Sequence, residues 1–207
     1  MSSRGRPRSF RIEDALDAAM KVFWRKGYEG ASLTDLTQAT GLNRPSLYAA
    51  FGDKESLFVK ALDHYAKGPA NYVQGALNQP TARAVAEHLL YGGVDVVTDP
   101  QSPRGCLIVQ GALACGDGSE VVQREINLRR SAGEKAIRLR LQRAKNDGDL
   151  PAEANAADLA RYLVTMMRGT AVLAAGGASR AELKRVVRLA LCAWPDSFRR
   201  TKRLDPC

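Results

Sequence analysis

The stretch TGLNRPSLYAAFGDKESL, from Thr40 to Leu57, interrupts an otherwise helical pattern with two glycines and a proline. Gly41 favours a tight turn, and Pro45 is tolerated in the first turn of a helix, where its missing N–H costs little. Asn43 and Asp53 each precede a helical segment and can accept hydrogen bonds from its first N–H groups. The stretch therefore predicts a turn, a short exposed helix and the capped start of another helix.

The residues before this stretch predict two further helices. Apolar residues between positions 12 and 23 recur on one helical face, and the pair Lys26-Gly27 is a typical helix end. Ser32 and Asp35 have the spacing of a capping box, so a second helix begins there and stops at the glycine turn. Short helices around a glycine turn are typical of a helix-turn-helix, although ordinary helical hairpins share the pattern.

The chain is basic along its whole length. Its 207 residues carry a formal net charge of +9, and the sequence pI is about 9.7. Such a balance favours an anionic partner, such as nucleic acid or an acidic membrane, although a basic surface without a partner is the alternative. Arginines without any acid among them open the sequence, which is typical of a basic arm that binds nucleic acid. They are Arg4, Arg6, Arg8 and Arg11.

The cysteine and histidine content argues against a metal site. The four cysteines form no CxxC pair, and the chain has only two histidines, so we expect neither a metal nor a cofactor. The most apolar stretch, residues 162–178, is broken by Arg168, and no secretory segment follows the first arginines. We therefore expect no membrane partner and a cytoplasmic location with reduced thiols.

Helical periodicity continues through the rest of the chain, and no alternating strand pattern appears. Gly68-Pro69 predicts a bend after the N-terminal helices. A long helix is expected over about residues 119–145, with two apolar stripes that both pack. The sequence predicts an all-α fold in which residues 1–67 form an N-terminal arm and helix-turn-helix domain and residues 68–207 form a C-terminal helical domain.

Two C-terminal helices have the pattern of an interface pair. Apolar residues recur with helical spacing between positions 159 and 173, and again between positions 183 and 194. The two helices can be core helices of a monomer, or half of a four-helix bundle made by two copies. In the second interpretation the homodimer interface comprises Leu159, Tyr162, Leu163, Met166, Leu183, Val186, Val187, Ala190, Leu191 and Trp194.

The segment ASLTDLTQATGLNRPSLYAAFGDKESLF combines a Ser-started helix, a glycine turn, a Leu-Tyr-x-x-Phe helix and a Lys-x-x-Leu helix start. In this order and spacing it resembles the signature of TetR/AcrR-family transcriptional repressors. Thr37 and Thr40 stand where the family usually has alanine, and we expect them to fit with slightly looser helix packing. The resemblance is strong over residues 9–67 and architectural beyond. Its elements are Ser32, Gly41, Leu42, Leu47, Tyr48, Phe51, Lys54 and Leu57.

The resemblance implies that the third helix enters the major groove of DNA. Arg44 is the expected base reader, because a guanidinium can bond guanine O6 and N7 together, although a contact to phosphate alone is the alternative. Lys54 and Thr34, both near helix starts, are expected to bind phosphate. The complete expected DNA-binding set is Arg4, Arg6, Arg8, Thr34, Asn43, Arg44, Pro45, Ser46, Tyr48 and Lys54.

The resemblance also implies a C-terminal domain that dimerises and binds an unidentified small-molecule effector. Cys106 is in addition a candidate redox or electrophile sensor, because a helix start and the nearby Arg104 raise thiol reactivity. The alternative is a small buried hydrophobe, as free cysteines usually are. The candidate pocket residues, each of which can equally belong to the core, are Tyr65, Tyr72, His88, Tyr91, Cys106, Ile108, Met166 and Met167.

Other classes of function have less support. The sequence contains no GxSxG, P-loop, GxGxxG or HExxH motif, so we expect no enzyme. A DNA binder without sequence preference is the competing class, but a short capped recognition helix favours a specific reader. Together with the residues above, the resemblance implies a homodimeric repressor on a palindromic double-stranded DNA operator. Release would follow effector binding or, alternatively, modification of Cys106.

Overall fold

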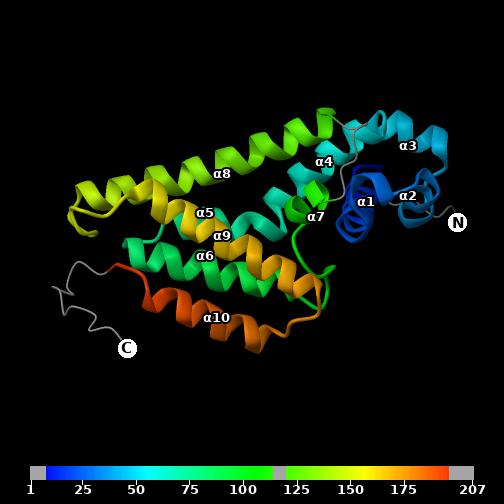
Figure 1. The fold of residues 1–207 in the computed structure, drawn as a ribbon. Helices are drawn as coiled ribbons and strands as arrows, with labels where there is room; N and C mark the ends of the chain where they lie inside the picture. The colour runs from blue at the N-terminus through cyan, green and yellow to red at the C-terminus, as the bar shows by residue number, and fades with distance from the viewer. Residues whose placement is uncertain (1–7, 114–119, 196–207) are drawn as a thin grey trace, which may run out of the picture. The chain divides into compact units, whose positions relative to one another are not determined.

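Helices make up all the regular structure that the computed structural model describes, in residues 8–113 and 120–195. Side chains are described for residues 12–111 and 120–195. The all-α prediction is confirmed, and Figure 1 shows the helices in chain order from blue to red. They are α1 (Arg8–Gly30), α2 (Leu33–Thr40), α3 (Arg44–Phe51), α4 (Lys54–Lys67), the 3₁₀ turn η1 (Pro69–Asn71), α5 (Tyr72–Leu77), α6 (Ala82–Val97), α7 (Leu107–Leu113), α8 (Glu120–Asn146), α9 (Ala156–Ala175) and α10 (Arg180–Cys192).

The chain divides into two compact units. The first contains residues 1–71 and 96–130, so α7 and the start of α8 pack with the N-terminal helices. The second contains residues 72–95 and 131–207. This division by packing differs from the functional division at residues 67 and 68, which stays a prediction.

Aromatic side chains on α1 and α4 form the core of the first unit. The rings of Phe23 and Phe58 lie edge to face with centroids 5.0 Å apart, and the rings of Trp24 and Tyr65 do so at 4.8 Å. Phe23, Trp24 and Phe58 are fully buried, and both α2 and α7 pack against α1. Because such close-packed interiors resist deformation, α1 and α4 give the short helices α2 and α3 a firm base.

A glycine interrupts α1 near its end. Gly27 has φ 70° and ψ −179°, a conformation that favours glycine because it has no Cβ. The ring of the next residue, Tyr28, lies against those of Phe23 and Phe58, with centroids 6.3 and 5.3 Å away. The helix end predicted at Lys26-Gly27 corresponds to this interruption.

A buried arginine closes the connection between α5 and α6 in the second unit. Arg140 of α8 is only 8% exposed, and its Nε donates to the carbonyl of Leu77 at 3.1 Å. Its Nη2 donates to the carbonyls of Gln79 and Pro80 at 2.7 and 3.1 Å. These carbonyls lie at the end of α5 and just beyond it, where no helical partner is available, so Arg140 fixes the connection against α8.

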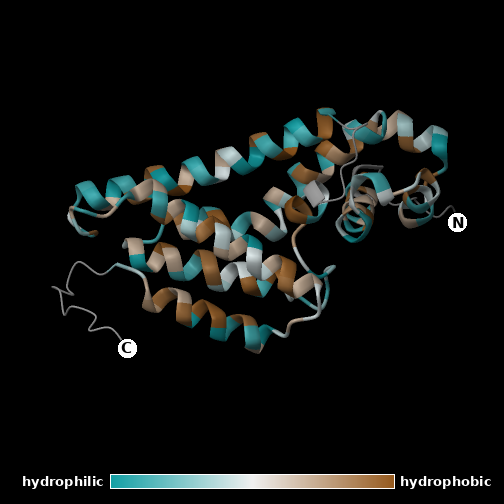
Figure 2. Ribbon diagram, in the orientation of Figure 1, coloured by the Kyte–Doolittle hydropathy of each residue, from teal (hydrophilic) through white to brown (hydrophobic). Residues whose placement is uncertain are grey.

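The long helix α8 packs only one of its two predicted apolar stripes within the described chain. The three large members of the other stripe are 52%, 60% and 53% exposed, so the prediction that both stripes pack is wrong for one protomer. Figure 2 shows α8 as a largely hydrophilic helix with separate hydrophobic residues. None of the described helices is both long and apolar enough to span a bilayer. The buried stripe is Val122, Ile126, Ile137 and Ala144, and the exposed stripe is Val121, Leu128, Ala132 and Leu139.

Candidate nucleic-acid interface

Side-chain caps fix the start of each short helix, as the sequence predicted. The Asn43 carbonyl Oδ1 accepts the N–H of Ser46 at 2.9 Å at the start of α3, and Asp53 Oδ1 accepts the N–H of Ser56 at 2.7 Å at the start of α4. Gly41 ends α2 with φ 66°, in the left-handed region. The turn between α2 and α3 is thus defined by local chemistry on both sides.

The start of α2 is also tied to α1. Ser32 and Asp35 form the expected capping box, in which Ser32 Oγ accepts the Asp35 N–H at 3.1 Å and Asp35 Oδ2 accepts the Ser32 N–H at 3.0 Å. The ammonium of Lys26 on α1 donates to Asp35 Oδ1 at 2.6 Å. The hydrogen bond from Lys26, followed by those from Ser32, lowers the pKa of Asp35 to about 2.

The outer face of α3 offers the side chains that the sequence predicted for DNA. Arg44, Pro45 and Ser46 are exposed at its N-terminal end, whereas Leu47 and Phe51 are 1% and 2% exposed and anchor the opposite face. The Arg44 guanidinium carbon lies 5.5 Å from the ring centroid of the half-buried Tyr48. This cation–π contact orients Arg44 beside the helix without covering it.

Two further predicted phosphate ligands lie at helix starts. Thr34 is exposed in the first turn of α2, and Lys54 is the first residue of α4. The Lys54 ammonium lies 4.4 Å from the ring centroid of Tyr28, and burial lowers the pKa of this lysine. Free N–H groups at a helix start and a lysine beside them can bind one phosphate together. Of the arm, Arg4 and Arg6 lie outside the described residues, and Arg8 begins α1 but has no described side chain.

Two side-chain hydrogen bonds near the ends of α3 were not predicted from the sequence, one from Thr40 at the end of α2 and one from Lys60 of α4. The Thr40 hydroxyl donates to the Leu36 carbonyl at 2.8 Å and accepts the Leu42 N–H at 3.3 Å, while the expected looser helix packing at this position stays a prediction. Lys60 of α4 donates to the carbonyl of Phe51 at 2.8 Å. The Lys60 contact depends on the angle between α3 and α4, which no local sequence signal encodes.

The structure places the expected effector residues in different surroundings. Tyr65 is 2% exposed, and its hydroxyl donates to Cys106 Sγ at 3.4 Å, both in the first unit. His88 is exposed on α6, where its Nδ1 lies 3.2 Å from the Ala84 carbonyl, so the expectation that it faces a cavity is wrong. In the second unit the ring of Tyr72 lies against α6. The remaining candidates, all half-buried, are Tyr91, Ile108, Met166 and Met167.

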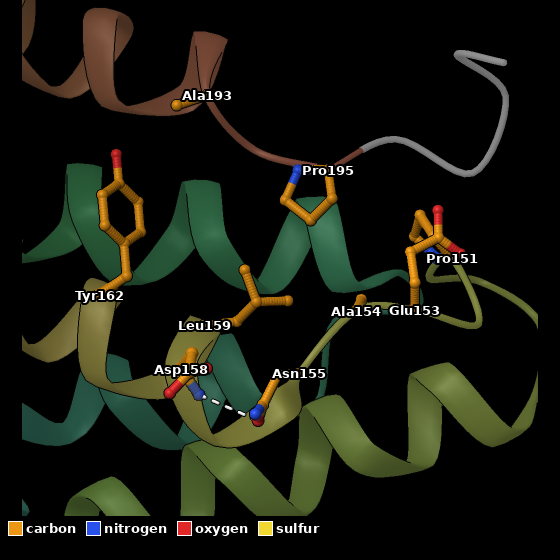
Figure 3. Close-up of a pocket in the computed structure, with 9 residues that line it drawn as sticks. All are labelled: Pro151, Glu153, Ala154, Asn155, Asp158, Leu159, Tyr162, Ala193 and Pro195. Atoms are coloured by element: carbon orange, nitrogen blue, oxygen red, sulfur yellow. Dashed lines mark hydrogen bonds between the residues drawn. The ribbon is translucent and has the colours of Figure 1, made fainter. Parts of the chain in front are cut away.

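A hollow of about 510 Å³ opens on the second unit between the start of α9 and the end of α10 (Figure 3). Leu159 projects from α9 toward Pro195 and Tyr162 projects toward Ala193, while Glu153 and Asp158 contribute carboxylates. None of the eight expected effector residues lines it. A smaller hollow of about 230 Å³ lies along α8 in the first unit and is lined by Gln123, Ile126, Asn127 and Arg130. Within the described residues, no three His, Cys, Asp or Glu side chains gather to hold a metal.

Most residues of the expected dimer interface already pack inside one protomer. A residue with less than a tenth of its surface exposed has little area left to give a partner, so this part of the expectation is corrected. The residues corrected in this way are Leu163, Leu183, Val187, Ala190, Leu191 and Trp194. Three large apolar side chains outside the expected interface list stand out from α9 and α10 instead, and of these only Leu173 belonged to the predicted periodic pattern. They are Val172, Leu173 and Leu189, which are 51%, 51% and 73% exposed, beside the half-buried Leu159, Tyr162, Met166 and Val186.

Comparison with known proteins connects this geometry to a family. Residues 15–61, which include α2, α3 and most of α4, match the model of bacterial regulatory proteins of the tetR family. Residues 83–190 match the model of tetracyclin repressor-like C-terminal domains. The two models together span most of the described chain.

Whole-length relatives agree. The HTH-type transcriptional repressor ComR of Escherichia coli (strain K12) is 32% identical over 94% of this chain and 93% of its own. A cysteine mutant of the TetR family transcriptional regulator CifR, complexed with 26-base-pair double-strand operator DNA, is 42% identical with a TM-score of 0.86, over 92% of this chain and 100% of its own. A TetR regulator from Rhodococcus sp. RHA1 is 41% identical with a TM-score of 0.62, over 87% and 98%. The chain therefore belongs to the TetR family of DNA-binding transcriptional regulators.

Proposed function

We propose that this chain is a dimeric repressor that reads a palindromic operator with α3 and leaves it when a small-molecule effector binds the C-terminal domain. The DNA-binding part of this proposal rests on one observation. Arg44, Pro45 and Ser46 are exposed together at the N-terminal end of α3, and the opposite face of this helix is buried. The operator complex of the CifR variant, 42% identical, supports this use of the fold.

Different residues carry specificity and affinity in this proposal. Arg44 bonds a guanine edge in the major groove, which discriminates between sequences. Lys54, Thr34 and the Tyr48 hydroxyl bind phosphates, which positions α3 but conveys no sequence information. The arginines of the N-terminal arm enter the adjacent minor groove. Binding should fall steeply with salt, because each phosphate that these cations neutralise releases counterions.

The test is binding of the purified protein to DNA from immediately upstream of its own gene, against random DNA of equal length, by fluorescence anisotropy at near-physiological salt. Arg44→Ala should lose the preference for the upstream DNA, whereas Lys54→Ala should weaken binding to both. Equal losses on both DNAs for both variants would contradict this division of roles. Equal weak binding of the wild type would favour a binder without sequence preference.

Dimerisation through α9 and α10 follows from the apolar side chains that remain exposed there. A single reading helix buries too little surface for tight specific binding, and two copies solve this by reading two half-sites. Leu189, 73% exposed, is the best single probe because its loss leaves the protomer core intact. Leu189→Arg should shift the sedimentation profile from dimer to monomer while the far-ultraviolet dichroism stays unchanged, and a persistent dimer would contradict this interface.

The effector half of the proposal rests on differential affinity. A ligand that binds the DNA-released state more tightly than the DNA-bound state shifts the population toward release. The half-buried Tyr72, Tyr91, Met166 and Met167 of the second unit remain the proposed lining, without His88. Screening small molecules for loss of operator binding tests this, and substitution of Met167 by a bulkier side chain should block any effector that uses this lining.

Sensing through Cys106 is the alternative trigger, and one contact favours it. The Tyr65 hydroxyl donates to Cys106 Sγ, and the Tyr65 ring packs edge to face on Trp24, so the thiol before α7 is linked to α4 and α1. A bulky group on the sulfur would displace Tyr65 and disturb these helices. Treatment with N-ethylmaleimide should then release operator DNA from the wild type and from Cys192→Ser, but not from Cys106→Ser. An unreactive Cys106 would exclude the idea.

A further inference from the structure

We infer that Thr40 and Lys60 fix the two ends of α3 and thereby set how well the protein discriminates its operator from other DNA, without contacting DNA themselves. The inference uses the DNA binding of the family and the reading role of α3 proposed above. It assigns positioning roles to two residues, one before and one after the reading helix.

Thr40 holds the turn in front of α3. Its hydroxyl donates to the carbonyl of Leu36 within α2 and accepts the N–H of Leu42, which lies beyond Gly41. One hydroxyl therefore bonds both sides of the turn. Leu42 is packed against the core of the first unit, so the bond also fixes where the chain leaves the core and enters α3.

Lys60 holds the other end. Phe51 is the last residue of α3, and the last carbonyls of a helix have no partner within it. The Lys60 ammonium donates to the Phe51 carbonyl at 2.8 Å across the junction with α4. A cation at a helix C-terminus is also favoured by the helix dipole. The bond thus joins α3 to α4, whose core-facing residues Leu57 and Phe58 are buried.

The position of α3 matters more for base contacts than for phosphate contacts. A helix of eight residues is too short to be stable alone, so its orientation depends on what holds its ends. Bidentate contacts to a base edge need a defined geometry, whereas contacts to phosphates tolerate shifts and carry most of the non-specific affinity. Releasing one end of α3 should therefore weaken operator binding and leave random DNA binding nearly unchanged.

Lys60 is itself a cation, so the experiment must separate positioning from direct phosphate binding. The specific probe is a duplex that the wild type selects from a random-sequence pool, and the reference is an unselected duplex of equal length. Failure to select any duplex would refute the proposed function itself. Lys67→Met serves as the charge-matched control, because Lys67 is exposed on the same helix.

For Lys60→Met we expect operator binding about two- to tenfold weaker, the loss typical of one hydrogen bond. Binding to the unselected duplex and the salt dependence of log Kd should match those of Lys67→Met. Lys60→Arg should restore operator binding because it keeps a donor. An equal loss on both duplexes with a salt slope smaller by about one would identify a phosphate contact and overturn the inference. An unchanged operator affinity would also overturn it.

Thr40 is tested against Thr37, its neighbour on α2. The Thr37 hydroxyl donates to the Thr34 carbonyl inside α2, whereas the Thr40 hydroxyl bonds across the turn to the Leu42 N–H. Thr40→Ala should bind the operator about two- to tenfold more weakly, with no change in binding to the unselected duplex. Thr40→Ser should restore the operator affinity. Thermal unfolding of each variant separates this loss from misfolding. A loss in Thr37→Ala as large as in Thr40→Ala, or no rescue by serine, would contradict a role for the bridging hydroxyl.

Discussion

A methyl group added at Gly92 tests the packing of α5 on α6 directly. A Cβ at this position would lie 2.6 Å from Cδ2 of the Tyr72 ring, well inside ordinary van der Waals contact. Overpacking of this kind costs about 1–3 kcal/mol, and the better helix propensity of alanine returns about 0.5–1 kcal/mol. At the midpoints of these ranges, we therefore expect Gly92→Ala to lower the free energy of unfolding by a net of about 1 kcal/mol.

Gly133 in α8 supplies the matched control, because a Cβ built there meets no atom within 4 Å apart from its chain neighbours and the backbone of its own helix. Gly133→Ala should raise the free energy of unfolding by about 0.5–1 kcal/mol, because alanine has the better helix propensity. The assay is urea unfolding followed by far-ultraviolet dichroism at one fixed protein concentration, because the proposed dimerisation would make stability depend on concentration. The midpoints of the two variants should move in opposite directions.

Removal of the ring provides the decisive comparison. In a Tyr72→Ala background the obstacle is gone, so the additional Gly92→Ala change should become stabilising, as at Gly133. A double-mutant cycle measures this coupling, which should be about 1–3 kcal/mol. If Gly92→Ala stabilises the protein with Tyr72 in place, or if its effect is the same in both backgrounds, the Tyr72 ring does not pack on this face of α6 and the reasoning fails.

Other changes give separate tests of the first unit. Phe58→Ala removes a fully buried ring and should cost about 3–5 kcal/mol of unfolding free energy, measured by urea unfolding, and a loss below about 1 kcal/mol would contradict its burial. Gly41→Ala should destabilise by about 1 kcal/mol through its left-handed φ of 66° alone, because no atom lies within 4 Å to clash. The pKa of Asp35 falls from 3.8 to about 2 on folding, so its stabilising contribution is complete above pH 3.8 and disappears as pH falls toward 2. Between these pH values the melting temperature should fall more steeply with decreasing pH in the wild type than in Asp35→Asn. Identical pH dependences of the melting temperature would refute the capping box as a stabilising feature.

Local chemistry explains why the reading unit could be predicted from sequence. Asn43, Asp53 and Ser32 cap helices within three residues of themselves, and Gly41 needs only its own backbone conformation. Such signals do not depend on the rest of the fold. Local signals of this kind do not predict the Lys60 bond to the Phe51 carbonyl, because that bond joins two helices whose angle is set by the core.

The C-terminal helices show the limit of periodicity. A helical repeat identifies the apolar face of α10 but not whether its own protomer or a second copy covers that face. Val187 and Leu191 follow the repeat and are buried inside the protomer, whereas Leu189 breaks it and is 73% exposed. Only the three-dimensional structure therefore identifies the apolar face of α10 that stays exposed in one protomer. The choice of His88 as a pocket residue was wrong for a similar reason. The position of one residue on an amphipathic helix does not show which neighbouring helix or solvent it faces.

The packing of the first unit offers a short route from a bound effector to α3, the helix proposed to read the operator. The start of α8 belongs to the same compact unit as α1 to α4, and Arg129 of α8 bonds Asp63 of α4 at 2.7 Å. A Cβ at Gly111 of α7 would lie 3.1 Å from the side chain of Ile126 and 3.3 Å from that of Phe58, so α7, α8 and α4 meet with little spare room. Because closely packed contacts transmit displacement rather than absorb it, an effector that moved α7 or the start of α8 would act directly on α4. In the proposed effector response, the Lys60 bond to the Phe51 carbonyl would then pass the displacement from α4 to the end of α3.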